Sequence, residues 1–424
     1  MIQGRLKDWL QDRAEETAAF LSQLIKAAST TGLERPAQEL MAEKLRQLGM
    51  EVDVWEPGGA ELTGHQYFYS PRTEFAGSPN VVGVLKGTGG GRSLLINGHI
   101  DVVPPGEPEL WQLSPWSGHI EDGKVFGRGA SDMKGGTVAA VLAVEAVRAL
   151  GITLKGDIVI ESVVEEESGG SGTLAAILRG YRADAALVPE PSGMTVFSEQ
   201  QGSMWFRISV QGRVAHGGTR YEGVSALEKM ITVIKQVEEL EKQRNGTLAG
   251  TPLYSGVPIP IPINIGRIEG GSWPSSVPDL VTIEGRMGVA PAEQMEEAQK
   301  ELEESLLALK AVDPWFVEYP PTVEWFGARW LPGSIPADHP IMAILTENYR
   351  HVLGIEPPVK ASPWGTDGGL LTQLAGIPTV VLGPGITALA HFPNENIELK
   401  RILEAAEIYA LTIMDWCGAE GGTD

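Results

Sequence analysis

Four short apolar segments, each followed by a loop that carries histidine or carboxylate side chains, constrain the fold of this chain more than any other feature. The segments precede His99, the Glu165–Glu167 run, Glu190 and the loop that ends at His391. Helical segments separate them, and this alternation of strand and helix favours an α/β domain with a mixed, largely parallel sheet flanked by helices. Ligands of such sheets bind outside the carboxyl ends of the strands, so we expect the functional site there.

The pattern of expected strands and helices changes at about residue 200 and again at about residue 327. Between these points the expected elements are strand, helix, strand, strand, helix and strand, which fits a ferredoxin-like α+β module. With 424 residues, the chain exceeds the ~250–300 residues at which single hydrophobic cores stop growing. We therefore predict a catalytic domain from residues 1–199 and 327–424, with residues 200–326 inserted as a second domain.

The acidic composition and the single cysteine exclude several classes of function. Lys and Arg number 33 against 55 Asp and Glu, and the net charge of −22 argues against nucleic acid or an anionic membrane as a partner. Cys417 stands alone, so any metal must be held by His, Asp and Glu rather than by cysteines. Neither a secretory signal segment nor an apolar run of the ~18 residues that span a membrane is present, and we expect a cytoplasmic protein.

Several side chains at predicted strand or loop ends have the chemistry of a dinuclear metal site. Two histidines and three carboxylates suit two zinc ions that share one bridging carboxylate; they are His99, Asp132, Glu167, Glu190 and His391. Singly, each has an ordinary alternative, such as a structural histidine at His99, a helix N-cap at Asp132 or a solvated charge at Glu190. Glu166 can serve as general base for a water that two metals activate, and Asp101 can hold the second ring nitrogen of His99.

Five motifs, taken in order, resemble the dinuclear-zinc family of acetylornithine deacetylase, succinyl-diaminopimelate desuccinylase, aminoacylase-1 and glutamate carboxypeptidase. They are His99-Ile100-Asp101-Val102-Val103-Pro104, the segment GRGASDMKGG at 127–136, Glu165-Glu166-Glu167, Glu190-Pro191 and His391-Phe392-Pro393-Asn394-Glu395. The resemblance extends over nearly the whole chain and is specific for the family, not for one member. It implies a zinc-exopeptidase-like catalytic domain and an inserted lid and dimerisation domain.

The resemblance also implies a metal-binding role for each matching residue. Asp132 would bridge two zinc ions per subunit, for which cobalt can substitute, and the peptide bond after it would be cis. His99 and Glu190 would complete the coordination of one ion. Glu167 and His391 would complete that of the other.

Further catalytic and substrate roles follow from the same resemblance. Asp101 would orient a metal-bound histidine, and Glu166 would act as general base and then as proton donor to the leaving amine. His216, in the inserted domain, would reach the active site of the partner subunit and stabilise the oxyanion, which implies a homodimer; a surface histidine is the alternative. Arg286 would bind a substrate carboxylate through its planar fork, unless it forms a plain salt bridge, and Gly365 would approach that carboxylate through its backbone.

Two departures from the family pattern affect this transfer of roles. Glu165 stands where relatives usually carry Asp, and Ser275-Ser276-Val277-Pro278-Asp279 replaces their Asn-Val-Val-Pro-Asp, so a side-chain amide that contacts substrate is missing. Our leading interpretation is a deacylase for a small N-acylated amino acid or related amine, in which a zinc-bridging hydroxide attacks the amide. The alternatives are a carboxypeptidase or dipeptidase for short peptides, an N-formyl or N-carbamoyl amidohydrolase, and a non-catalytic binding homologue.

Overall fold

The protein, described here from a computed structural model of residues 2–420, consists of two compact units. The first comprises the residues up to 199, 333–362 and those from 366 on, and the second comprises 200–332 and 363–365. The return to the first unit follows residue 332 and not 327, because strand β13 (Thr322–Trp330) continues through that position. In the second unit, the side chain of Gln201 donates to the carbonyl of Pro363. None of the helices within residues 2–420 is both long and apolar enough to cross a lipid bilayer.

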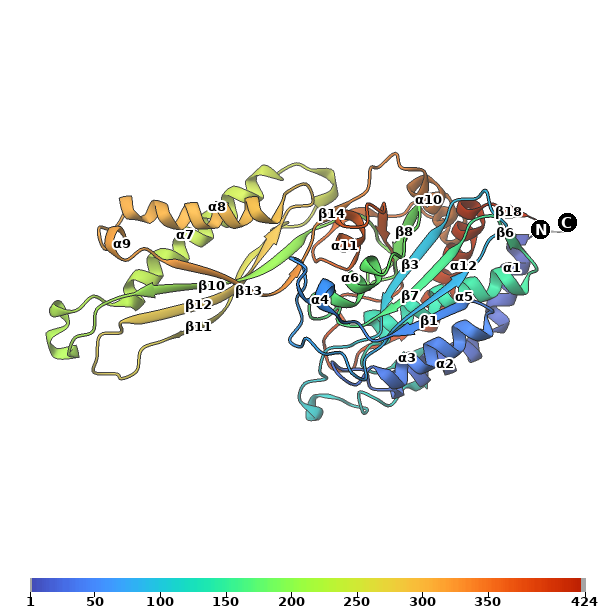
Figure 1. The fold of residues 1–424 in the computed structure, drawn as a ribbon, viewed down its shortest axis with the longest axis horizontal. Coiled ribbons are helices and arrows are strands. Elements are labelled where there is room, and N and C mark those ends of the chain that lie inside the picture. Colours follow the sequence, from blue (N-terminus) through green and yellow to red (C-terminus); the bar gives the residue numbers. More distant parts are fainter. Residues whose placement is uncertain (1, 421–424) are drawn as a thin grey trace. The chain divides into compact units, whose positions relative to one another are not determined.

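A nine-stranded sheet forms the centre of the first unit within the described residues (Figure 1). Its strands are β1 (Glu51–Trp55), β2 (Asn80–Leu85), β3 (Leu94–His99), β7 (Ile158–Val163), β8 (Ala185–Val188), β9 (Val196–Gln200), β14 (Gly333–Ser334), β15 (Val359–Ser362) and β16 (Thr379–Val381). The order is β1-β2-β7-β3-β8-β16-β9-β14, with β15 paired to β9. The four central strands, β7, β3, β8 and β16, are parallel, and β2 and β9 join them antiparallel. The predicted α/β class with a mixed, largely parallel sheet is confirmed.

Helices cover both faces of this sheet. They are α1 (Ile2–Asp12), α2 (Ala14–Lys26), α3 (Arg35–Gln47), α4 (Ala60–Thr63), α5 (Gly135–Ala149), α6 (Ser171–Leu178), α10 (Pro340–Leu353), α11 (Gly368–Gln373) and α12 (Leu399–Cys417). Successive residues of a strand point to opposite faces. On β3, the amide of Asn97 donates to Thr173 of α6 at 2.8 Å. Its neighbour Gly98 instead packs against Thr137 of α5, which lies beside α12, so the strand is buried between two helical layers.

Two small antiparallel sheets complete the described part of the first unit. One has the order β17-β5-β4 and the other pairs β18 with β6. Their strands are β4 (His119–Glu121), β5 (Lys124–Phe126), β6 (Thr153–Leu154), β17 (Asn396–Glu398) and β18 (Ala419–Glu420). Because β17 pairs with β5, the segment that follows residue 391 is held close to the loop that precedes α5.

The second unit has a four-stranded antiparallel sheet with the helices on one face (Figure 1). Its elements, in chain order, are β10 (Gly202–Gln211), α7 (Ala226–Thr247), β11 (Ile263–Gly270), β12 (Leu280–Val289), α8 (Met295–Leu307), α9 (Trp315–Glu318) and β13. The sheet order β11-β12-β10-β13 is the ferredoxin-like arrangement, which confirms that prediction. Met204, Phe206 and Ile208 of β10 are buried because α7 packs on their side of the sheet.

Candidate metal centre and active site

Adjacent parallel strands bring the candidate ligands to one edge of the first unit's sheet. β3 ends at His99, Glu166 and Glu167 follow β7, and Glu190 follows β8. The loop after β16 carries His391. Because the carboxyl ends of parallel strands meet at the same edge, residues that are distant in the sequence converge there.

Asp132 lies between two histidine–glutamate pairs. Nε2 of His99 is 3.2 Å from Oδ1 of Asp132 and 3.7 Å from Oε1 of Glu190. On the other side, Oδ2 of Asp132 is 3.3 Å from Nε2 of His391. That nitrogen is 3.0 Å from Oε2 of Glu167. The arrangement is the one that a carboxylate bridging two metal ions would need.

The site concentrates more negative charge than its two histidines can neutralise. Burial and the neighbouring Glu190 raise the pKa of Glu166 well above its ordinary value, and burial raises the pKa of Glu190 itself to about 7. Hydrogen bonds to Asp132 and Glu167 raise the pKa of His391 to about 10. These side chains therefore bind protons more tightly than usual, because a positive charge is stabilised at this position. A set of buried carboxylates and imidazoles of this kind fits two divalent metal ions.

Asp101 contacts His99 mainly through its backbone carbonyl, whereas its carboxylate contacts the segment that carries Glu166 and Glu167. Nδ1 of His99 is 2.8 Å from the backbone carbonyl of Asp101, and 3.8 Å from its carboxylate. Because a carbonyl only accepts, Nδ1 carries the proton and the lone pair of Nε2 faces the site. The carboxylate of Asp101 instead accepts the backbone N–H groups of Glu166 and Glu167, at 3.3 and 3.1 Å. Its side chain therefore fixes the segment that carries the candidate base.

Glu165 and Glu166 point to different surroundings. Glu165 has a left-handed backbone, with φ of 65°, and its buried carboxylate accepts a hydrogen bond from Nε of Arg72 at 2.6 Å. The carboxylate of Glu166 lies within 4.8 Å of the ligand atoms of His99 and Glu190. Glu166 is therefore the member of the pair that lies among the candidate ligands, whereas Glu165 anchors the loop to the rest of the unit.

Two buried residues to which no role was assigned from the sequence hold the loop around Asp132. The carboxylate of Glu395 accepts the backbone N–H groups of Ser131 and Asp132, at 2.8 and 3.0 Å. It also pairs with Arg128 at 2.7 Å. The peptide bond after Asp132 is cis, as the resemblance implied. Arg128 and Glu395 lie inside two of the motifs, and the need of a buried charge for a partner was the signal that could have connected them.

A chain of buried polar groups connects β3 and β7 to the N-terminus of α11. Asn97 donates to the carboxylate of Glu161 at 2.9 Å and to Thr173 at 2.8 Å. Thr173 in turn donates to Asp367 at 2.6 Å. Burial raises the pKa of Glu161 to about 7 and that of Asp367 to about 6. Glu161 was missed because it lies in a mainly apolar strand, and Asp367 because it lies in a loop-to-helix junction without a recognisable partner in the sequence.

The remaining predicted site residues, His216, Arg286 and Gly365, belong to the second unit. Nδ1 of His216 accepts the backbone N–H of Gly218 at 3.1 Å, so the neutral ring carries its proton on Nε2. Arg286 lies on β12 without a carboxylate partner among the residues that the structure describes. Gly365 packs so closely that an added Cβ would lie 2.6 Å from the Cβ of Trp330.

Comparison with known proteins gives matches over most of the chain. Residues 95–415 match the family model of peptidase family M20/M25/M40. The chain is 33% identical over 401 residues to N-formyl-4-amino-5-aminomethyl-2-methylpyrimidine deformylase of Halalkalibacterium halodurans, covering 90% of this chain and 89% of that protein. It is 27% identical over 385 residues to acetylornithine deacetylase of Proteus mirabilis, covering 90% of each. The fold is similar to the crystal structure of aminopeptidase PepT from Bacillus cereus, with a TM-score of 0.70, 22% identity and coverage of 94% and 98%.

Proposed function

The chain belongs to peptidase family M20/M25/M40 and is a hydrolase, and from this premise we propose that it removes the formyl group from the nitrogen of a small heteroaromatic amine. The proposal rests on 33% identity, over 90% of the chain, to a deformylase named for such a substrate. The acetylornithine deacetylase is more distant, at 27% identity. These identities favour an N-formyl substrate over an N-acylated amino acid.

We assign two divalent metal ions, taken to be zinc, to the five ligands at the sheet edge. Asp132 would bridge them, His99 and Glu190 would hold one, and Glu167 and His391 would hold the other. This assignment is supported by the ligand atoms of His99, Asp132 and Glu167, which all lie within 4.8 Å of one another. When bound, the ions would polarise the amide carbonyl and lower the pKa of the attacking water.

Glu166 moves the proton in this scheme. Its carboxylate takes a proton from the attacking water and returns it to the leaving amine. The carboxylate of Glu166 lies within 4.8 Å of the ligand atoms of His99 and Glu190, a position that suits a general base for a water at this site. The hydrogen bond from its backbone N–H to Asp101 fixes the segment from which it acts.

His216 supplies the donor for the oxyanion, and we propose that it does so in a homodimer formed through the second unit. Because its Nδ1 accepts from Gly218, Nε2–H is the group it can donate. β11 is an edge strand of the sheet, and exposed apolar side chains lie next to it. Leu227, Ile268 and Trp273 line a groove of about 560 Å³ there. Such an edge is suited to pairing with a second copy.

Arg286 and Gly365 contact the part of the substrate beyond the amide bond in this proposal. Arg286 is partly buried, and burial lowers its pKa, with no compensating carboxylate among the residues that the structure describes. A buried guanidinium of this kind is stabilised when a ligand supplies a hydrogen-bond acceptor for it. The cytoplasmic location stays a prediction from the sequence.

A hydrolysis screen tests the proposed reaction. Zinc- and cobalt-loaded protein is offered N-formyl aminomethylpyrimidine, N-acetyl amino acids, N-succinyl amino acids and dipeptides at equal concentrations. We expect the formamide to have the highest kcat/KM, and Glu166→Ala protein loaded in the same way controls for contaminating hydrolases. A higher kcat/KM for an N-acetyl amino acid or a dipeptide would contradict the proposal.

A further inference from the structure

A row of four side chains crosses one face of the second unit's sheet. Trp205 of β10 is paired with Arg286 of β12, and Arg286 with Asn264 of β11. On its other side, Trp205 is paired with Phe326 of β13. Directly opposed residues point to the same face, with Cβ atoms about 4.5–5.5 Å apart. The row therefore extends over three strand spacings, roughly 14 Å.

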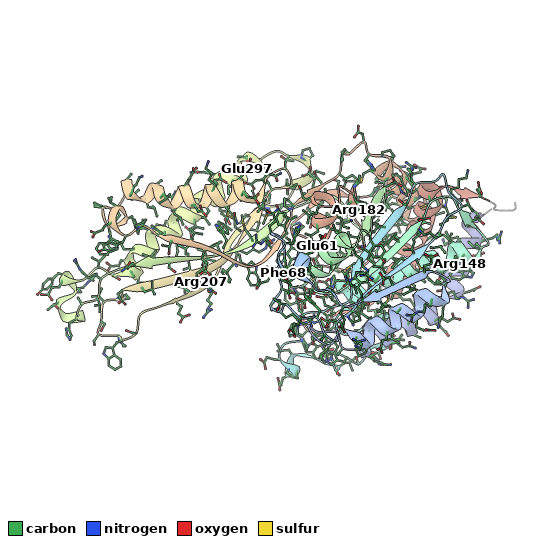
Figure 2. The ribbon with its side chains drawn as sticks, in the orientation of Figure 1. Glu61, Phe68, Arg148, Arg182, Arg207 and Glu297 are labelled. Atoms are coloured by element: carbon green, nitrogen blue, oxygen red, sulfur yellow. The ribbon has the colours of Figure 1, made fainter. Side chains whose placement is uncertain are left out.

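This face is the one that the helices of the unit leave uncovered. Met204 and Phe206, the neighbours of Trp205 along β10, are buried on the helix side, whereas Trp205 itself is 39% exposed. Arg207, two residues beyond Trp205 and on its face, projects away from the helix that carries Glu297 (Figure 2). Trp205 and the exposed Asn264 are therefore accessible to a small molecule on this face, with the half-buried Arg286 between them.

The polar groups of the row have no protein partner among the described residues. Two other arginines of this sheet, Arg207 and Arg267, both pair with Glu284, at 2.8 and 3.2 Å. In contrast, neither Arg286 nor the side chain of Asn264 forms a hydrogen bond or ion pair within residues 2–420. A guanidinium and an amide side by side offer several donors and one acceptor to a ligand.

Trp205 and Phe326 supply an aromatic surface in the same row. Their rings meet edge to face, with centroids 6.0 Å apart. Gly327 has φ of 67° and packs beneath the indole, because an added Cβ would lie only 2.5 Å from Cε3 of Trp205. The guanidinium of Arg207 covers Phe326, 4.5 Å from its centroid. These contacts hold the indole in place while a large part of it remains exposed.

We propose that the row Asn264–Arg286–Trp205–Phe326 is the subsite for the heteroaromatic ring of the substrate amine, an inference that rests on the proposed function. The ring stacks on the indole of Trp205, and Arg286 donates to the ring nitrogens. The carbonyl of Asn264 accepts from an exocyclic amino group. A carboxylate, which the family resemblance led us to expect, would satisfy Arg286 but would use neither aromatic side chain.

The test compares three N-formyl substrates whose amines carry a pyrimidinylmethyl, a benzyl or a butyl group. In Trp205→Leu we expect KM to rise about 5- to 100-fold for both ring substrates, as for the loss of a base–aromatic stack, with kcat little changed. KM for the butyl substrate should stay the same.

Trp325→Leu is the matched control, because Trp325 pairs with the buried Phe206 on the other face, and it should preserve the ring preference. Arg286→Lys, which loses the planar fork, should abolish the preference for pyrimidine over benzyl.

Two results would overturn the subsite. One is an equal change of KM for ring and butyl substrates in Trp205→Leu. The other is a loss of affinity in Arg286→Lys that is confined to N-formyl amino acids, since the row would then be a carboxylate site.

Titration calorimetry with the free pyrimidinylmethyl amine separates this inference from the proposed reaction. Wild-type protein that binds the amine more tightly than Trp205→Leu does, yet leaves its formamide intact, would refute the deformylase alone and support the subsite. Equal affinity of both proteins for the amine would refute the subsite whatever the reaction.

Discussion

The carboxylate of Glu395 accepts the backbone N–H of Asp132 at 3.0 Å. It thereby fixes the main chain of the residue proposed to bridge two metal ions, although the two residues are distant in the sequence. Groups that hold a metal ligand in this way typically contribute 10- to 100-fold to metal affinity.

Glu395→Ala should therefore weaken zinc binding by about 10- to 100-fold, because the loop around Asp132 loses its anchor. Competition with a chelator measures the affinity. The exposed Glu398, three residues on, provides the control variant Glu398→Ala, which should bind zinc like the wild type. Unchanged affinity in Glu395→Ala would show that the loop holds its position without this carboxylate.

Purified protein should contain about two zinc ions per chain, because the site offers one bridging carboxylate and two further ligands for each ion. Elemental analysis gives the stoichiometry, and removal of the metal by a chelator should abolish hydrolysis until zinc or cobalt is added back. Full activity in a rigorously metal-free preparation would rule out the dinuclear site.

Substitution of Glu166 should lower kcat, whereas substitution of Glu165 should lower thermal stability. Glu166→Ala should lower kcat by at least about 10²–10⁴-fold, since general-base assistance is lost, while metal content stays near that of the wild type. Glu165→Ala should mainly lower Tm, because it removes one of the two carboxylates that pair with Arg72, the other being Glu34 at 2.9 Å. Steady-state kinetics and thermal unfolding of both variants provide the test. The reverse pattern would mean that Glu165 is the base.

His216→Ala should lower kcat by about 10²–10³-fold if its Nε2–H binds the oxyanion. If it acts on the neighbouring subunit, mixing inactive His216→Ala and Glu166→Ala proteins under subunit exchange should restore activity, to about a quarter of the wild type at equal mixing. This follows because half of the dimers are then mixed, and each mixed dimer has one intact site. No recovery despite demonstrated exchange would assign His216 to its own subunit or to no catalytic role.

Glu161 should make stability depend on pH. Burial raises its pKa from 4.5 to about 7 in the folded protein. In this window the folded state holds a proton that the unfolded chain has released, so this contribution to the free energy of unfolding is lost as pH rises. Relative to wild type, Glu161→Gln should therefore gain on the order of 3 kcal/mol between about pH 4.5 and pH 8. Urea unfolding at both pH values gives the difference, and a difference that does not vary with pH would contradict the shift.

The convergence of the candidate ligands was predictable because most of them follow apolar strand segments. Hydrophobic periodicity identifies such segments, and a parallel sheet brings their ends together, so His99, Glu167 and Glu190 could be grouped without coordinates. Asp101 was expected to hold His99 through its carboxylate, but its backbone carbonyl lies closer to Nδ1 of His99, at 2.8 Å against 3.8 Å. Sequence spacing does not separate these two groups.

Contacts between distant segments were beyond the reach of the sequence. The pairing of Trp205 with Arg286 depends on strand register, and a register shift of one residue would turn one of them to the other face. Register is set by the packing of whole strands and not by a local motif. The end of a strand is likewise set by its pairing with a neighbour, so the residues near 327 did not reveal that β13 continues through that position.

The assignment of Pro363–Gly365 to the second unit has a consequence for how specificity can be inherited. Recombination between relatives that exchanges only residues 200–332 would separate Gln201 from Pro363, and would place a foreign Trp330 equivalent against Gly365. A chimaera of this kind keeps every candidate metal ligand, but its Pro363–Gly365 segment comes from a different parent than the rest of the second unit. An exchange that keeps these contacts within one parent must therefore transfer both segments together.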